Sequence, residues 1–488
     1  MLHTSPKTKW HAGAWHGGDR QICRYELLIH GPTATFTYDD ASQLTSLASI
    51  LRGMPDMPIE SFTYGYDPVG NRTSLADRFG VHTFGYDVLS RLTSATHPVV
   101  APFVAEAFSY DPVGNRTSSH LSPGGYAYET ANRLLEDDTF IYTYDGNGNL
   151  TTKTDQTTSA VTTYTYDGEN QLTRVALPDG RTVAYRYDGL GRRMERAVTA
   201  GATERFLYDQ EDLVEVYNLA GCWQQTIFHG PGIDQPYAFI RDTDGSCSPS
   251  WGIFAEPARY LTTDGLGSIT ALSAAVGGSS AAINLAERYV YDSFGNLTIT
   301  DASGNPRATS AYGERYFFTG REYDFETGLY HNRRRDWDPT TGRFVQEDPV
   351  LGITRLPLSF NRYLYVGSNP TNKIDPFGDL SLSQVLTIVT IVSTLLLLSS
   401  LQRFGCDSVG VARRLEDAAL RSISRNPEEA EINAQGLYGK SLDQLTREEL
   451  INVGRTMMDF KRDVAKEEGK LVIDGFDVVT SSQKRPTR

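Results

Sequence analysis

Residues 142–152 read YTYDGNGNLTT, and this stretch decides the fold because variants of it recur along the chain. Its two tyrosines are two positions apart, so on a strand their side chains share one face. Asp145 can accept a hydrogen bond from the backbone two residues on, and Gly146 and Gly148 can supply a positive φ for a turn. Threonine and leucine then open a return strand. The stretch therefore predicts one β-hairpin.

The dipeptide Tyr-Asp occurs ten times, where chance pairing would give about two. The tyrosines of these pairs are Tyr38, Tyr66, Tyr86, Tyr110, Tyr144, Tyr166, Tyr187, Tyr208, Tyr291 and Tyr323. Most neighbours are 20–24 residues apart, which is hairpin spacing. Since a single hairpin is marginal in water, the copies must stack to bury their aromatic rows. We expect residues 36–345 to be almost entirely antiparallel strand, curled into an open or half-closed shell.

A second signal lies at 315–352, RYFFTGREYDFETGLYHNRRRDWDPTTGRFVQEDPVLG, and at 360–379, FNRYLYVGSNPTNKIDPFGD. Together with the Tyr-Asp units, these segments resemble the Rhs/YD-repeat family, which includes Rhs proteins, wall-associated proteins, toxin-complex C components and teneurins. The resemblance implies a hollow β shell built from the repeats. It also implies an Rhs repeat-associated core module over residues 255–380.

In several members of that family the core module is an aspartyl self-protease that releases the C-terminal tail. The resemblance carries this role to Arg335, Asp348 and Asp375. Two close carboxylates can share a proton, so that one activates water and the other protonates the leaving group, while a guanidinium positions them. The alternative is structural, because Asp-Pro is a good turn sequence and Arg335 can simply pair with an acid.

The expected cut lies near Gly378, Asp379 and Leu380. The family motif ends Asp-Pro-x-Gly-Leu, whereas this chain has Asp379 after the glycine and Leu380 one place later. An acid therefore stands where an apolar residue is expected.

The remaining organisation follows from composition. We expect an irregular segment over 1–35, a repeat shell over 36–254 and the core module over 255–380. Residues 381–402 contain no charged side chain and are long enough for a transmembrane helix, which needs about 20 residues; a buried helix is the alternative. Residues 403–488 are expected to be mainly helical, with a short hairpin around Asp474-Gly475 near the end.

Charge and residue types exclude several functions. The net charge is −14, and residues 1–380 carry all of it because residues 381–488 hold 15 basic and 15 acidic side chains. The acidic body repels phosphate, so no nucleic-acid binding is expected for residues 1–380. The four cysteines have no metal-ligand spacing, and residues 381–488 contain no histidine, which excludes histidine-metal nucleases and the usual zinc deaminases. We expect no cofactor and no metal.

Two functions remain open at this point. The first is a polymorphic-toxin carrier, in which the shell encloses its own C-terminal tail as cargo and a small immunity protein is a partner. The second is a non-enzymatic structural or adhesion protein that binds carbohydrate or protein and is anchored by the hydrophobic helix. Both imply secretion or a place at the cell envelope or surface, although residues 1–18 lack the apolar core of a cleavable signal peptide.

Overall fold

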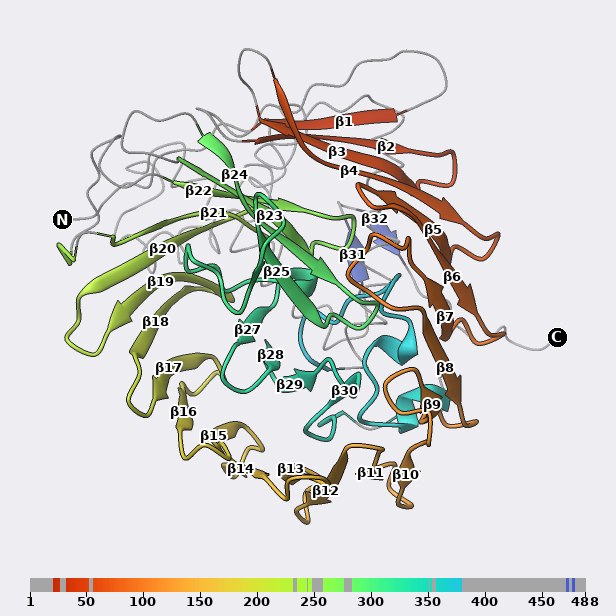
Figure 1. Ribbon diagram of the computed structural model, residues 1–488, viewed down its shortest axis with the longest axis vertical. Coiled ribbons are helices and arrows are strands. Elements are labelled where there is room, and N and C mark those ends of the chain that lie inside the picture. The colour runs from red at the N-terminus through yellow and green to blue at the C-terminus, as the bar shows by residue number, and fades with distance from the viewer. Residues whose placement is uncertain are drawn as a thin grey trace. The chain divides into compact units, whose positions relative to one another are not determined.

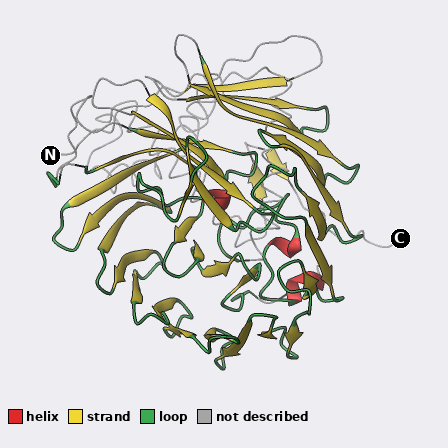
Figure 2. Cartoon of the chain, in the orientation of Figure 1, coloured by secondary structure: helices red, strands yellow, loops and turns green. Residues whose placement is uncertain are grey.

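The computed structural model describes residues 21–26, 32–51, 56–230, 235–243, 245–247, 258–275, 283–350, 352, 357–379, 471–473 and 476–478. The chain divides into two compact units, residues 1–399 and 400–488. Within the described part of the first unit, antiparallel strands dominate and three short 3₁₀ helices accompany them (Figure 2). The predicted mostly-β class is confirmed.

Consecutive strands pair with one another in every sheet. The first sheet has nine strands: β1 (Gln21–Glu26), β2 (Pro32–Tyr38), β3 (Leu44–Leu51), β4 (Met57–Tyr66), β5 (Arg72–Asp77), β6 (Gly80–Tyr86), β7 (Leu92–Thr96), β8 (Glu106–Tyr110) and β9 (Arg116–Ser119).

The second sheet has 17 strands: β10 (Ala127–Tyr128), β11 (Leu134–Glu136), β12 (Phe140–Tyr144), β13 (Leu150–Asp155), β14 (Val161–Tyr166), β15 (Leu172–Ala176), β16 (Thr182–Tyr187), β17 (Arg193–Val198), β18 (Thr203–Asp209), β19 (Asp212–Asn218), β20 (Trp223–His229), β21 (Pro236–Arg241), β22 (Arg259–Thr263), β23 (Ile269–Ala275), β24 (Ile283–Tyr291), β25 (Leu297–Asp301) and β26 (Pro306–Arg307). A third sheet contains β27 (Glu322–Asp324), β28 (Leu329–Asn332), β29 (Arg335–Asp338) and β30 (Arg343–Phe344).

The turn of the repeat is built as its sequence predicts, with one correction. Oδ1 of Asp145 accepts hydrogen bonds from the backbone N–H groups of Asn147 and Asn149, both at 2.9 Å, and Oδ2 accepts from the Asn149 side-chain amide at 2.9 Å. Gly148 has a φ of 86°. Gly146, which was also expected to supply a positive φ, does not have one, because the side chain of Asp145 already caps the first half of the turn.

In several repeats the second tyrosine links its hairpin to the preceding one. Its hydroxyl donates a hydrogen bond to a carbonyl on the return strand of the previous hairpin. The pairs are Tyr66 with Leu44 (2.8 Å), Tyr86 with Arg72 (2.6 Å), Tyr110 with Leu92 (2.7 Å), Tyr187 with Leu172 (2.8 Å) and Tyr208 with Arg193 (2.9 Å). In these repeats the turn and the tyrosine both hold the hairpin in place, so the two sequence signals recur together.

The first and last parts of the strand series also meet. Tyr64 on β4 accepts a hydrogen bond from the backbone N–H of Gly265, which follows β22, at 2.9 Å. Ala271 on β23 packs with Leu51 and Ile59 from β3 and β4 in one buried cluster. The strands thus curve around until β2–β4 contact β22–β24 (Figure 1). This arrangement is the predicted shell.

Inside the curve of strands lie the third sheet and three 3₁₀ helices (Figure 1). The helices are η1 (Phe318–Gly320), η2 (Pro357–Phe360) and η3 (Val366–Ser368). We call residues 315–379 the plug. Its centre is aromatic, with the rings of Trp337 and Tyr365 stacked at 4.3 Å between centroids. Buried ion pairs join it to the shell: Arg193 with Glu322 (2.5 Å), Arg196 with Asp324 (2.9 Å) and Lys153 with Asp338 (2.9 Å).

Strand pairing starts earlier than expected, so the irregular segment over 1–35 needs correction. β1 spans Gln21–Glu26, and it pairs in register with β2, which begins at Pro32. No Tyr-Asp pair precedes β1 or β2, and the Tyr-Asp pair is the sequence signal from which the hairpins are predicted. The structure also joins Cys222 to Cys247 in a disulfide with Cα atoms 4.5 Å apart, a pairing that the sequence did not indicate.

In the second unit, β31 (Leu471–Ile473) and β32 (Phe476–Val478) pair antiparallel, which confirms the predicted hairpin around Asp474-Gly475. The hydrophobic helix expected at 381–402 and the helical segments expected over 403–488 lie outside the described residues. Among the residues that are described, no helix has the length and apolar character needed to cross a bilayer.

Candidate active site

The structure brings the three predicted residues together. Arg335, on β29, is 1% exposed, and its Nη2 atom lies 2.9 Å from Oδ2 of Asp348 and 3.5 Å from Oδ2 of Asp375. Both carboxylates are also buried. One guanidinium therefore bridges two acids in the interior of the plug.

Arg335 is fixed by the plug on its other sides. Nη1 donates a hydrogen bond to the carbonyl of Arg362 at 2.9 Å, and the guanidinium carbon lies 3.6 Å from the ring centroid of Phe344. Burial lowers the pKa of Arg335, and the charges of Asp348 and Asp375 oppose that shift. The carboxylates thus help to keep the buried arginine charged.

Asp348 is held by its own turn and by a second arginine. Its backbone N–H donates to the Arg362 carbonyl at 2.9 Å, and its Oδ1 accepts from the N–H of Val350 at 2.8 Å. Nε of Arg362 donates back to the Asp348 carbonyl at 2.6 Å. These bonds leave Oδ2 directed at Arg335.

Asp375 has a raised proton affinity. Burial raises its pKa to about 6, with a smaller opposing effect from Arg335 and Arg321. Its Oδ1 accepts a hydrogen bond from the N–H of Gly378 at 2.9 Å, and its carbonyl accepts one from Nη2 of Arg321 at 3.1 Å. A carboxyl with this pKa can hold or release a proton near neutral pH.

Gly378, at the expected cut, contacts the same arginine. Nε of Arg335 donates to the Gly378 carbonyl oxygen at 2.5 Å. Gly378 has a φ of 68°, and a Cβ atom at this position would lie 1.9 Å from the carbonyl oxygen of Asn332. Only glycine allows the backbone to approach the β28–β29 turn so closely.

Asp379, the departure from the family motif, is accommodated. Its Oδ2 accepts a hydrogen bond from Nη1 of Arg334 at 2.9 Å, and the residue is 6% exposed. Burial raises the pKa of its carboxyl, and Arg334 opposes the shift. Leu380 lies outside the described residues.

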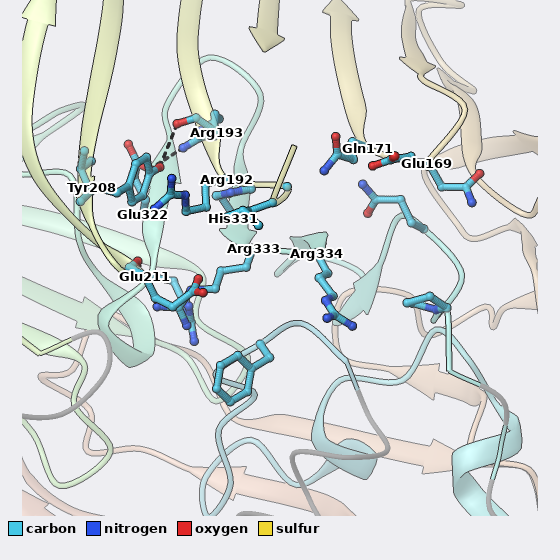
Figure 3. Close-up of a pocket in the computed structure, with 18 of the residues that line it drawn as sticks. Glu169, Gln171, Arg192, Arg193, Tyr208, Glu211, Glu322, His331, Arg333 and Arg334 are labelled. Carbon is cyan, nitrogen blue, oxygen red and sulfur yellow. Dashed lines mark hydrogen bonds and ion pairs between the residues drawn. The ribbon is translucent and has the colours of Figure 1, made fainter. Parts of the chain in front are cut away.

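A cavity of about 400 Å³ adjoins this end of the plug. Arg333, Arg334, Pro349 and Phe377 line it on the plug side, and Arg192 lines it from the shell. Figure 3 shows Arg333 and Arg334 projecting into this space from the turn between β28 and β29. The cavity offers water a place beside Phe377, next to the expected cut.

A family model for the teneurin YD-shell matches residues 81–371, more than half of the chain, and an RHS repeat model matches residues 62–99. The chain belongs to the teneurin YD-shell family. This assignment confirms the predicted relationship to Rhs and YD-repeat proteins.

Curated relatives of this YD-shell protein include toxins and a teneurin. It is 29% identical over 336 residues to double-stranded DNA deaminase toxin A of Burkholderia cenocepacia, covering 64% of this chain and 22% of the toxin. It is 29% identical over 255 residues to the tRNA nuclease WapA of Bacillus subtilis (52% and 10%) and 23% identical over 426 residues to teneurin-3 of Danio rerio (73% and 15%). The chain thus spans less than a quarter of each of these relatives.

Among solved structures, the Tc holotoxin pore of Photorhabdus luminescens is similar to 73% of this chain, with 19% identity and a TM-score of 0.48. The aligned part is 18% of that chain.

The residues of this YD shell that hold the three site residues in place could not be identified from the sequence. Arg321 and Arg362 each bond a backbone carbonyl of one catalytic candidate, and Phe344 packs on the guanidinium of Arg335. No spacing rule connects these residues to the acids. The one available signal for Phe344 is its place in the Gly-Arg-Phe motif.

Proposed function

We propose that this chain is a carrier shell of the polymorphic-toxin type, which cleaves itself at the end of the plug and frees its C-terminal region as cargo. One observation carries the proposal: the Arg335 guanidinium contacts two buried acids and the carbonyl of Gly378 at once. A purely structural ion pair does not require a third bond to the carbonyl at the expected cut.

The hydrolysis assigns one role to each group. Arg335 polarises the Gly378 carbonyl and stabilises the oxyanion that forms when water adds to its carbon. Asp348 takes a proton from that water, and protonated Asp375 gives a proton to the departing nitrogen of Asp379. The bond between Gly378 and Asp379 breaks, which leaves a carboxyl group on Gly378 and an amine on Asp379. The pKa of about 6 at Asp375 makes the required proton available near neutral pH.

Variants of the three residues test the cleavage on denaturing gels. Asp348→Asn and Arg335→Ala should leave one full-length chain, because the amide cannot take the proton and alanine cannot polarise the carbonyl. Asp338→Asn is the matched control, since Asp338 is also a buried acid of the plug paired with a cation, Lys153, but lies outside the site. The proposal fails if the wild-type chain and Asp338→Asn stay intact like the two site variants.

The cargo is the part of the chain after the cut. Expression of residues 381–488 alone should slow growth, while the full-length Asp348→Asn chain, which cannot release the cargo, should not. A small immunity protein is the expected partner of the free cargo, and the uncharged run 381–402 is the segment expected to contact membrane. If residues 381–488 are harmless and are needed for surface display, the adhesion function is supported instead.

The proposed place of action is outside the cytoplasm, in the secreted state or at the cell surface. The disulfide between Cys222 and Cys247 supports this, because disulfides persist in oxidising compartments.

A further inference from the structure

A second group of ionisable side chains lies away from the plug site, where strands from both shell sheets meet. Glu106 opens β8, His120 follows β9, and Asp292 follows β24. One ligand atom from each of the three lies within 4.8 Å of the other two. Glu106 is only 3% exposed. The group therefore combines one imidazole and two carboxylates in a largely buried place.

Only one of the two carboxylate oxygens of Glu106 has hydrogen-bond partners among the described residues. Oε1 lies 2.8 Å from Nε2 of His97 and accepts from the backbone N–H and the hydroxyl of Ser293 at 3.1 and 2.8 Å. Oε2 is buried and has no hydrogen-bond partner among the described residues. Nδ1 of His120 is likewise buried and without a described partner. Buried polar atoms normally have partners, so these two atoms call for a ligand that accepts lone pairs.

We propose that Glu106, His120 and Asp292 bind a divalent transition metal ion, with zinc as the best match. The ligands are Oε2 of Glu106, Nδ1 of His120 and a carboxylate oxygen of Asp292, with water as the fourth. One nitrogen and two oxygens suit zinc, whose ligands at about 2.1 Å lie roughly 3.4 Å apart, so modest side-chain rotations close the site.

His97 orients the Glu106 ligand from behind. Its Nδ1 lies 2.8 Å from Nδ1 of His82, whose Nε2 lies 3.1 Å from Asp77. Such a chain behind a ligand is the usual support of a metal site. A cavity of about 100 Å³, lined by His97, Asp292 and Ser293, lies beside the Asp292 side of the group.

Bound metal would act as a cross-link of the shell. Glu106 belongs to the first sheet and Asp292 to a turn of the second, so the ion would join the two sheets beside the Ser293 hydrogen bonds. Metal binding should therefore stabilise the folded shell by mass action.

The test is zinc titration of the full-length chain after EDTA treatment and dialysis, with a chromophoric chelator as competitor. The wild type should bind one equivalent more tightly than Glu106→Gln or His120→Ala, each by at least about 100-fold. His97→Ala removes only the orienting bond and should weaken binding about 10–100-fold. Zinc should raise the thermal midpoint of the wild type and leave that of Glu106→Gln unchanged.

Asp145→Asn is the matched control. Asp145 makes the same three turn hydrogen bonds as Asp292, but it is not part of the metal-ligand group. This variant should bind zinc like the wild type. Equal zinc affinity in the wild type and His120→Ala, or no uptake by the wild type, overturns the proposal. If Glu106→Gln loses its β circular dichroism, His120→Ala alone decides.

Discussion

Nε of Arg335 lies 2.5 Å from the carbonyl oxygen of Gly378, a residue 43 positions later in the chain. The same guanidinium contacts Asp348 and Asp375, so the end of the plug returns to the side chains proposed to cut it. The arrangement depends on glycine at 378, because a Cβ atom there would collide with the Asn332 carbonyl.

The first prediction concerns this close approach. Gly378→Ala should displace the segment from Arg335 and abolish cleavage. The added Cβ atom would collide with the Asn332 carbonyl, and the left-handed backbone at this position costs alanine about 1–2 kcal/mol. Denaturing gels of the purified variant measure the loss. Gly168→Ala is the control, since its Cβ has open space and its φ is not positive; it should cleave like the wild type.

The second prediction concerns the bond between neighbouring hairpins. Tyr187→Phe removes the hydroxyl that donates to Leu172 and should destabilise the shell by about 0.5–1.5 kcal/mol. Tyr166→Phe should be neutral or stabilising, because the buried Tyr166 hydroxyl has no hydrogen-bond partner among the described residues. Urea unfolding of both variants compares the midpoints. An unchanged midpoint for Tyr187→Phe would show that packing of the ring, which phenylalanine keeps, and not the hydroxyl ties the hairpins together.

The third prediction concerns pH. The folded-state pKa of Asp375, about 6, lies above the ordinary value near 3.8, so the folded protein binds the extra proton between these values. The protonated Asp375 carboxyl favours the folded state. This contribution to the free energy of unfolding is fully present below pH 3.8 and is lost as the pH rises through 6. Asp375→Asn mimics the protonated acid and should stabilise the chain at pH 7.5, by at most about 3 kcal/mol, with the gain vanishing below pH 3.8.

In the same experiment, Asp338→Asn should change the stability at pH 7.5 in the opposite direction. The pKa of Asp338 is lowered, because Lys153 and the hydrogen bonds from Thr340 and Lys153 outweigh burial. Its ionised form stabilises the fold above pH 3.8, and that contribution is lost as the pH falls below it. Thermal unfolding at pH 7.5 should therefore rank Asp375→Asn above and Asp338→Asn below the wild type. A destabilised Asp375→Asn would mean that its pairing with Arg335 outweighs burial.

The hairpins could be predicted because their signals are local. Asp145 and Gly148 act within one turn, and the Tyr-Asp pair that marks such turns occurs ten times along the chain. Arg335, Asp348 and Asp375 could be selected because a motif orders them along the chain. Their contact depends on how the plug folds, and no local rule gives it.

Other features depend on segments that are remote in the sequence. Glu106, His120 and Asp292 meet only because the strands curve until the two sheets adjoin, so their spacing carries no metal motif. Cys222 and Cys247 pair across a connection with no disulfide pattern. The β1 strand lacks the Tyr-Asp turn that marks the later hairpins, so it can be recognised as a strand only from its pairing with β2 in the structure.

Intact-mass spectrometry of the denatured wild-type chain tests the central claim most directly. Self-cleavage predicts two pieces of about 42 and 12 kDa, at roughly 110 Da per residue, and the exact masses locate the cut between Gly378 and Asp379. Asp379→Leu restores the apolar residue of the family motif and should cleave faster if the acid slows the reaction. A single mass for the full chain in both proteins would contradict the account, and Arg335, Asp348 and Asp375 would then be structural ties of the plug.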